Sequence, residues 1–127
     1  MSERPAIVSI NETEAGDDIR ISIALTWKDA EYVGEASGPS GWSYRPRLIG
    51  EATLRAVEAV TDNAVHLGLA AIATTPLGSA QVAMAQVTMD GSDEPLVGSA
   101  LIGTNDEAAA TVKAVLDAIN RRLVGVL

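Results

Sequence analysis

Several short segments of this sequence recur in the same order about sixty residues further along the chain, and this internal repeat limits the fold more than any other feature. The matches are Leu25-Thr26-Trp27 with Val87-Thr88-Met89 and Gly16 with Gly78 at an offset of 62, Tyr32–Ala36 with Leu96–Ala100 at an offset of 64, and Ala52–Val57 with Ala110–Val115 at an offset of 58. Because the order is kept, we predict a single domain, 1–127, made of repeat one at about 5–62 and repeat two at about 65–124.

Each repeat is predicted to contain three strands followed by a helix. In the first repeat, apolar and polar residues alternate from Ile19 to Lys28, which is the period-two pattern of a half-buried strand. A proline at position 46 suits the first turn of a helix, where its missing N–H is not needed. The predicted elements are strands at 6–11, 19–28 and 32–36 and a helix at about 46–62.

The second repeat gives the same order of elements. Asp90-Gly91 is a strong signal for a hairpin turn between two of its strands. Thr104, with Glu107 three residues later, fits a capping box at the start of the helix. The predicted elements are strands at 65–74, 80–89 and 96–102 and a helix at about 105–124.

The repeated order predicts an α+β fold in which duplicated βββα units form one six-stranded, mainly antiparallel sheet with two helices on one face. Six strands at about 4.8 Å make a sheet roughly 25 Å wide, and two helices of about 10 Å each cover one face of it. The strand at 65–74 is apolar on both sides, from His66 to Ala73. Because an apolar face usually meets another protein surface, we predict a homodimer or higher oligomer through the open sheet face.

Composition narrows the class of partner. The net charge is −8, which argues against nucleic-acid binding and against an anionic membrane surface, since both need clustered cations. The absence of cysteine excludes disulfides and cysteine-ligated zinc. No apolar run approaches the ~18 residues of a membrane span, so a cytoplasmic protein is expected. Because the chain has no phenylalanine, its core must consist mainly of Ile, Val, Leu and Ala.

The segment between the third predicted strand and the first helix is the candidate binding site. Helix N-termini attract anions, arginines add planar donors, and Trp and Tyr supply apolar walls with polar edges. The predicted ligand-binding residues are Gly38, Ser40, Trp42, Ser43, Tyr44, Arg45 and Arg47. The alternative is structural: the two aromatic residues plug the edge of a core poor in aromatics, and the two arginines offset nearby carboxylates.

The length of this connection favours the binding hypothesis. In the alignment of the two repeats, fifteen residues separate Ala36 from Ala52, but only nine separate the matching Ala100 and Ala110. A connection of this kind needs only about 2–6 residues. The aromatic and basic residues are therefore predicted to lie in six additional residues that the fold does not require.

Other residues that carry chemistry are scarce. His66, the only histidine, lies in an apolar strand, and we interpret it as a structural, hydrogen-bonded side chain rather than a general base. Asp17-Asp18 and residues 90–94 are interpreted as turns, since neither has the length or closing ligand of a calcium loop. Charged residues spaced by three and four form a helix stripe that we interpret as solvated, consisting of Arg47, Glu51, Arg55, Glu58 and Asp62.

No catalytic residue, cofactor or metal is predicted. The leading hypothesis is a non-enzymatic oligomeric module that binds a small anionic ligand, or a protein partner, through Gly38–Arg47. One alternative is a small enzyme whose active site lies at a subunit interface and uses Tyr44, Arg45 and His66. Another is a purely structural assembly protein, for which the apolar sheet face is the whole function.

Two βββα units, each leading from a stretch of small residues into its helix, resemble the C-terminal regulatory domain of 2-isopropylmalate synthase. That family has a Gly-x-Gly-Pro segment before the helix, which Ala36-Ser37-Gly38-Pro39 echoes, whereas the Asp-Ala expected next is replaced by Ser40-Gly41. The resemblance covers roughly residues 5–124 and implies a domain that dimerises and binds an amino acid at the dimer interface. We take the fold from it and not leucine sensing, because fold does not imply function.

Overall fold

Each repeat folds into three antiparallel strands followed by one helix in the computed structural model, which describes residues 5–41, 43–103 and 106–126. The first repeat consists of β1 (Ala6–Ala15), β2 (Asp18–Trp27), β3 (Ala30–Pro39) and α1 (Arg45–Val60). The second consists of β4 (Leu67–Leu77), β5 (Ala80–Met89), β6 (Leu96–Ile102) and α2 (Glu107–Val126). The α+β class and the duplicated βββα order are therefore confirmed.

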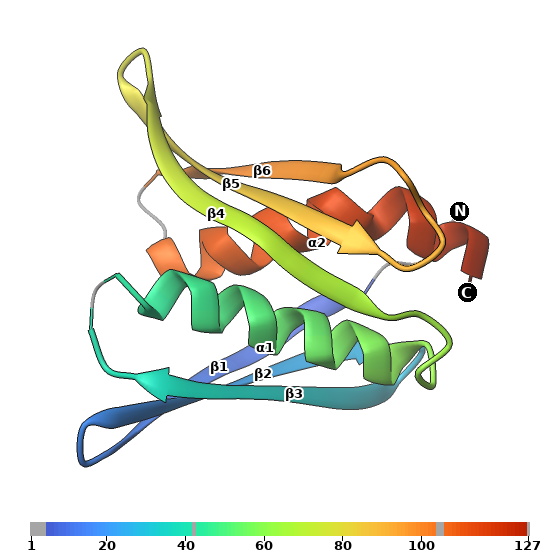
Figure 1. Cartoon of the computed structure of the whole chain (residues 1–127), viewed down its shortest axis with the longest axis horizontal. Coiled ribbons are helices and arrows are strands. Elements are labelled where there is room, and N and C mark those ends of the chain that lie inside the picture. The colour runs from blue at the N-terminus through green and yellow to red at the C-terminus, as the bar shows by residue number, and fades with distance from the viewer. Residues whose placement is uncertain (1–4, 42, 104–105, 127) are drawn as a thin grey trace.

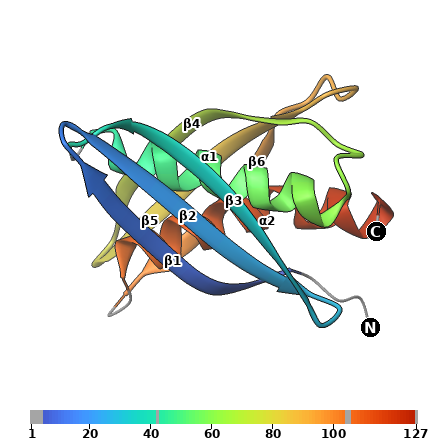
Figure 2. The same cartoon turned by 90° about the horizontal axis from the view of Figure 1, so that it is seen from below.

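The six strands form two separate sheets rather than one. The first sheet has the order β1-β2-β3 and the second β4-β5-β6, so the predicted single six-stranded sheet is wrong. The two helices lie in a layer between the sheets (Figure 1), and the first sheet crosses the helices in the view from below (Figure 2). Helix α1 packs on β2 and β3 and also contacts β4, whereas α2 packs on β5 and β6 and barely touches β1.

The residues of α1 explain this three-layer arrangement. Its buried positions occupy more than one side of the helix, so a sheet on one side alone would leave apolar surface in water. These positions are Leu48, Ile49, Gly50, Ala52, Thr53, Leu54, Ala56, Val57 and Val60. They join buried residues of both sheets and of α2 in one continuous core, which satisfies both sides of the helix.

Two glycines set the distance between each helix and its own sheet. A Cβ on Gly34 of β3 would lie 2.1 Å from the backbone nitrogen of Ala56 in α1. A Cβ on Gly98 of β6 would lie 2.2 Å from the backbone nitrogen of Ala118 in α2. Because no real side chain tolerates such distances, each helix crosses its sheet at a point that requires glycine.

These crossings show that the two helices correspond at an offset of 62. Ala52 and Ala56 meet Gly34 just as Ala114 and Ala118 meet Gly98. The strands agree with this offset, because β1 and β4 both shift register two residues into the pairing, after Ile7 and after Leu69. The match of Ala52 with Ala110 is therefore wrong by one helical turn. Because alanine recurs every four residues along α2, both alignments place an alanine opposite Ala52.

The corrected alignment removes the argument from loop length. Five residues separate the end of β3 at Pro39 from the start of α1 at Arg45. Four residues separate the end of β6 at Ile102 from the start of α2 at Glu107. In the corrected alignment, fifteen residues separate Ala36 from Ala52 and thirteen separate Ala100 from Ala114, so the first connection is longer by two residues rather than six. Both connections between elements fall within the common range of about 2–6.

Tight turns extend two of the hairpins beyond the predicted limits. Gly16 and Gly78 have φ angles of +64° and +62°, so each allows a two-residue turn, and β1 and β4 continue almost to these glycines. The tips of both hairpins project past the helix layer (Figure 1). Thr104 lies outside the described residues, and the carboxylate of Asp106 accepts a hydrogen bond from the Ala108 N–H at 3.0 Å, which caps the start of α2.

Candidate functional site

The predicted binding segment starts at the end of β3, where it is tied to the β1–β2 turn. Both the backbone N–H and the hydroxyl of Ser40 donate hydrogen bonds to the carbonyl of Asp17, at 2.9 and 3.1 Å. Gly38 packs against Leu48 of α1, since a Cβ there would lie 3.2 Å from the Leu48 Cδ2. Ser43 is exposed in the turn before α1, and Trp42 lies outside the described residues.

The two arginines of this segment have partners within the protein. Arg45 donates from Nε to Glu12 Oε1 at 2.6 Å. Arg47 lies 3.1 Å from Glu51 and also donates to the carbonyl of Leu69, again at 3.1 Å. These are the contacts that the structural alternative expects of the arginines. Ligand binding by the segment stays a prediction.

A shallow depression of about 520 Å³ lies beside this segment. Its lining residues are Glu12, Glu14, Ile19, Ser40, Gly41 and Arg45. One arginine faces two carboxylates, so the lining has a net charge of −1 (one positive group less two negative groups). A simple anion would be repelled there and would have to displace Glu12 from Arg45. A ligand with both an anionic and a cationic group fits the charges better.

The charged stripe of α1 was predicted to be solvated. Instead, three of its side chains bind backbone groups at the edge of β4. Arg55 Nη2 donates to the carbonyl of Leu67 at 2.5 Å, and the N–H of Leu67 donates to Glu58 Oε2 at 2.8 Å. Together with the bond from Arg47 to Leu69, these contacts satisfy backbone groups that face away from β5. An edge strand exposes such groups to unwanted pairing, so the stripe protects this edge.

His66 differs from its prediction. It precedes β4 and its side chain is exposed, so it is not a residue of an apolar strand interior. Among the residues that the structure describes, no hydrogen-bond partner is recorded for its ring, while its carbonyl accepts from the N–H of Asp90 at 3.1 Å. The prediction that His66 lies inside an apolar strand is therefore wrong, and its role as a structural, hydrogen-bonded side chain stays a prediction.

The outer faces of the two sheets differ in chemistry. Outward positions on the second sheet are uncharged and largely apolar: Ala71, Ala73, Thr75, Leu77, Val82, Met84, Gln86, Thr88, Val97, Ser99 and Leu101. We call these residues the outer face of the second sheet. The corresponding positions on the first sheet are polar for the most part: Ser9, Asn11, Thr13, Arg20, Ser22, Ala24, Thr26, Glu31, Val33, Glu35 and Ser37.

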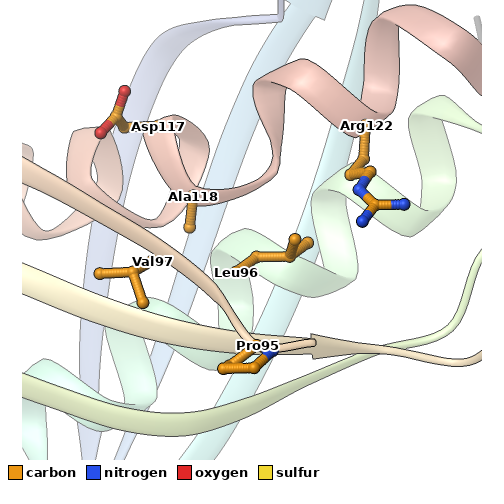
Figure 3. Close-up of a pocket in the computed structure, with 6 residues that line it drawn as sticks. All are labelled: Pro95, Leu96, Val97, Asp117, Ala118 and Arg122. Carbon is orange, nitrogen blue, oxygen red and sulfur yellow. The ribbon is translucent and has the colours of Figure 1, made fainter. Parts of the chain in front are cut away.

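Two further depressions flank α2, and sequence reasoning missed both. The smaller, of about 320 Å³, lies between α2 and the start of β6. In it, Arg122 points from α2 toward the side where Leu96 and Pro95 lie, whereas Asp117 points away from them (Figure 3). The larger, of about 460 Å³, lies between α2 and the beginning of β1. Its lining residues are Pro5, Ala6, Ile7, Ser99, Lys113, Leu116, Asp117 and Asn120.

Comparison with known proteins gives no family for this chain. No protein-family model matches it, and a search of curated proteins finds no significant match. The resemblance to the regulatory domain of 2-isopropylmalate synthase thus stays a prediction. Among the described residues, no helix is long and apolar enough to cross a membrane.

Proposed function

We propose that this protein is a non-enzymatic module whose copies associate through the outer face of the second sheet. The observation that carries the proposal is the contrast between the two outer faces. Leu77, Val97 and Leu101 leave 70%, 60% and 61% of their surfaces in water on a face without charge, whereas the first sheet presents arginine and glutamate. Such an apolar surface favours a protein partner.

A second copy of the chain is the partner that the charges favour. Two copies with a net charge of −8 repel each other, and an uncharged face allows them to meet where no carboxylates are brought together. Burying three large side chains on each copy contributes on the order of 10 kcal/mol before the entropic cost of association, which is itself several kcal/mol. With an entropic cost of about 4–5 kcal/mol, the remaining roughly 5–6 kcal/mol corresponds to a dissociation constant on the order of 100 μM.

Sedimentation velocity on matched variants tests this proposal. Met84→Lys places a charge on β5, the central strand of the second sheet, and should convert the dimer to a monomer. Val33→Lys places the same charge at a position that is 50% exposed on the first sheet, and should leave the dimer intact. Added salt should strengthen association because it screens the repulsion between acidic copies. A wild-type chain that stays monomeric at high micromolar concentration contradicts the proposal.

The second candidate function is ligand binding in the depression beside Gly38–Arg47. Its support is the pairing of Arg45 with Glu12 in an exposed depression that Glu14 also lines, which suits a small molecule carrying both charges. Thermal-shift screening on the wild type and on Arg45→Gln tests it. A ligand that raises the melting temperature of both chains equally does not use this depression.

The alternative of an interface enzyme has less support. Arg45 is held by Glu12, and the ring of His66 has no recorded hydrogen-bond partner among the described residues. A general base needs a second group that orients it and a nucleophile within reach. The contacts around Tyr44 and Arg45 supply neither.

A further inference from the structure

The cavity of about 460 Å³ between α2 and β1 has an unsatisfied hydrogen-bond acceptor in its lining. The side-chain oxygen of Asn120 is buried and has no hydrogen-bond partner among the residues that the structure describes. A buried acceptor without a partner costs about 1–3 kcal/mol, so a group that donates to it is stabilised there. The junction in the first repeat that corresponds to this cavity shows what kind of group that is.

In the first repeat, the corresponding junction between α1 and β4 is filled by guanidinium groups. Arg55 and Arg47 donate to the carbonyls of Leu67 and Leu69, which turn away from β5. Glu58 completes the junction by accepting the Leu67 N–H and by pairing with Arg55 at 2.8 Å. Three backbone groups at the start of this edge, the N–H and carbonyl of Leu67 and the carbonyl of Leu69, are therefore satisfied by side chains of α1.

The same positions in the second repeat lack both arginine donors. At the offset of 62, Arg47 becomes Ala109 and Arg55 becomes Asp117. Glu58 becomes Asn120, and the Leu67 whose N–H Glu58 accepts becomes Pro5, which has no N–H. Pro5 therefore cannot supply the N–H that Glu58 accepts in the first repeat. The carbonyls of Pro5 and Ile7 correspond to the two that accept from arginine in β4.

A difference in helix packing keeps the cavity open. A Cβ on Gly50 of α1 would lie 2.8 Å from Leu69, so glycine allows α1 to approach β4 closely. The equivalent residue of α2 is Val112, whose fully buried side chain occupies space that Gly50 leaves to its neighbours. Helix α2 accordingly stands further from β1 than α1 does from β4.

We propose that this cavity binds a guanidinium group of an arginine-like small molecule, in the place that Arg55 fills in the first repeat. A planar guanidinium supplies several N–H donors to two acceptors of this lining, the Asn120 oxygen and the Asp117 carboxylate. One Asp117 oxygen already accepts the N–H of Ser99 at 3.0 Å, so a ligand bound at Asp117 should change the chemical shift of the Ser99 amide. The exposed ammonium of Lys113 suits a carboxylate at the other end of the ligand.

Nuclear magnetic resonance titration of the labelled full chain with L-arginine tests the proposal. Arginine should shift the Asn120 side-chain amide and the Ser99 backbone amide. L-Citrulline keeps the shape but replaces the guanidinium with a neutral urea, and should bind at least about tenfold more weakly because charge-assisted hydrogen bonds are lost. Equal binding of citrulline would overturn the recognition of a cation.

Variants locate the site. Asn120→Asp adds a charge next to the guanidinium and should tighten arginine binding about tenfold, whereas Asn120→Leu should abolish it. Asp117→Asn gives a second loss-of-binding variant if Asn120→Leu folds poorly. Glu14→Gln alters the depression beside Gly38–Arg47 and should leave arginine binding unchanged.

Two outcomes reject the site directly. Arginine binding that is lost in Glu14→Gln but kept in Asn120→Leu places the ligand elsewhere. Equal arginine binding by the wild type and by Asp117→Asn also rejects the site, because that exchange removes the carboxylate that would pair with the guanidinium. Met84 pairs with Ser99 across β5 and β6, so the Asn120 side-chain amide on α2 is the readout that separates failure of arginine binding from failure of dimerisation.

Discussion

Substitution of Gly34 by alanine should destabilise the protein more than any other exchange of glycine for alanine in a strand, apart from the same exchange at Gly98. The added Cβ would lie 2.1 Å from the Ala56 nitrogen and 2.2 Å from the Ala52 carbonyl oxygen, against an ordinary contact limit of 3.4 Å. Helix α1 must therefore move by about 1.3 Å, which is the difference between 3.4 and 2.1 Å. Both neighbours are backbone atoms of one helix, so no side-chain rotation relieves the contact.

The magnitude follows from what that movement costs. Overpacking a core costs about 1–3 kcal/mol, and a gap of ~1 Å forfeits up to about half of each dispersion contact along the helix. We expect a loss of at least ~3 kcal/mol out of a total stability of about 5–15 kcal/mol. Urea denaturation followed by circular dichroism measures this loss, with the wild type and the variant compared at equal m-value.

Two control variants make the result decisive. Gly98→Ala should lose about as much as Gly34→Ala, because its Cβ would lie 2.2 Å from the Ala118 nitrogen. Gly16→Ala has no atom within 4 Å, and only its φ of +64° opposes it, which costs roughly 1 kcal/mol. If Gly34→Ala is no more destabilising than Gly16→Ala, the close crossing of helix and sheet is incorrect.

Three further substitutions test the contacts around the helix layer. Glu58→Ala leaves the Leu67 N–H without its acceptor and should cost about 1–3 kcal/mol in urea denaturation, whereas a loss below ~0.5 kcal/mol would show that water replaces the carboxylate. Arg45→Ala breaks the partly exposed pair with Glu12 and should lower the free energy of unfolding by at most about 1 kcal/mol. At high salt, the variant and the wild type should have equal stability. Asp29→Gly relieves a φ of +64° in the β2–β3 turn and should stabilise the protein by roughly 0.5–1 kcal/mol, seen as a higher melting temperature.

Local patterns in the sequence predicted the elements well because they depend on neighbours along the chain. The limits of β5 and β6 agree with the prediction, since alternation and the turn at Asp90-Gly91 mark them. The arrangement of the sheets could not be deduced in this way. It depends on whether charges on α1 face water or the edge of β4, and spacing alone does not distinguish these cases.

The candidate site was harder to predict because it depends on the register between the repeats. The alignment that is wrong by one helical turn gives the segment Gly38–Arg47 six additional residues. It therefore predicts a binding site at the aromatic and basic side chains of that segment. In the correct register, the notable differences lie elsewhere, at Arg55 against Asp117 and at Leu67 against Pro5. Only the Gly34 and Gly98 crossings fix that register.

Duplication explains how one chain contains both a sealed junction and an open one. Two copies of a βββα unit give two helix–edge junctions, and each edge strand carries backbone groups that need partners. At β4, the helix supplies partners for the Leu67 N–H and for the carbonyls of Leu67 and Leu69 through Arg47, Arg55 and Glu58. At β1, a proline removes one donor and α2 has Asp117 and Asn120 in place of Arg55 and Glu58, so the Asn120 oxygen is left without a partner among the described residues. This missing interaction in one repeat, compared with its counterpart in the other, is the observation from which we propose a ligand site.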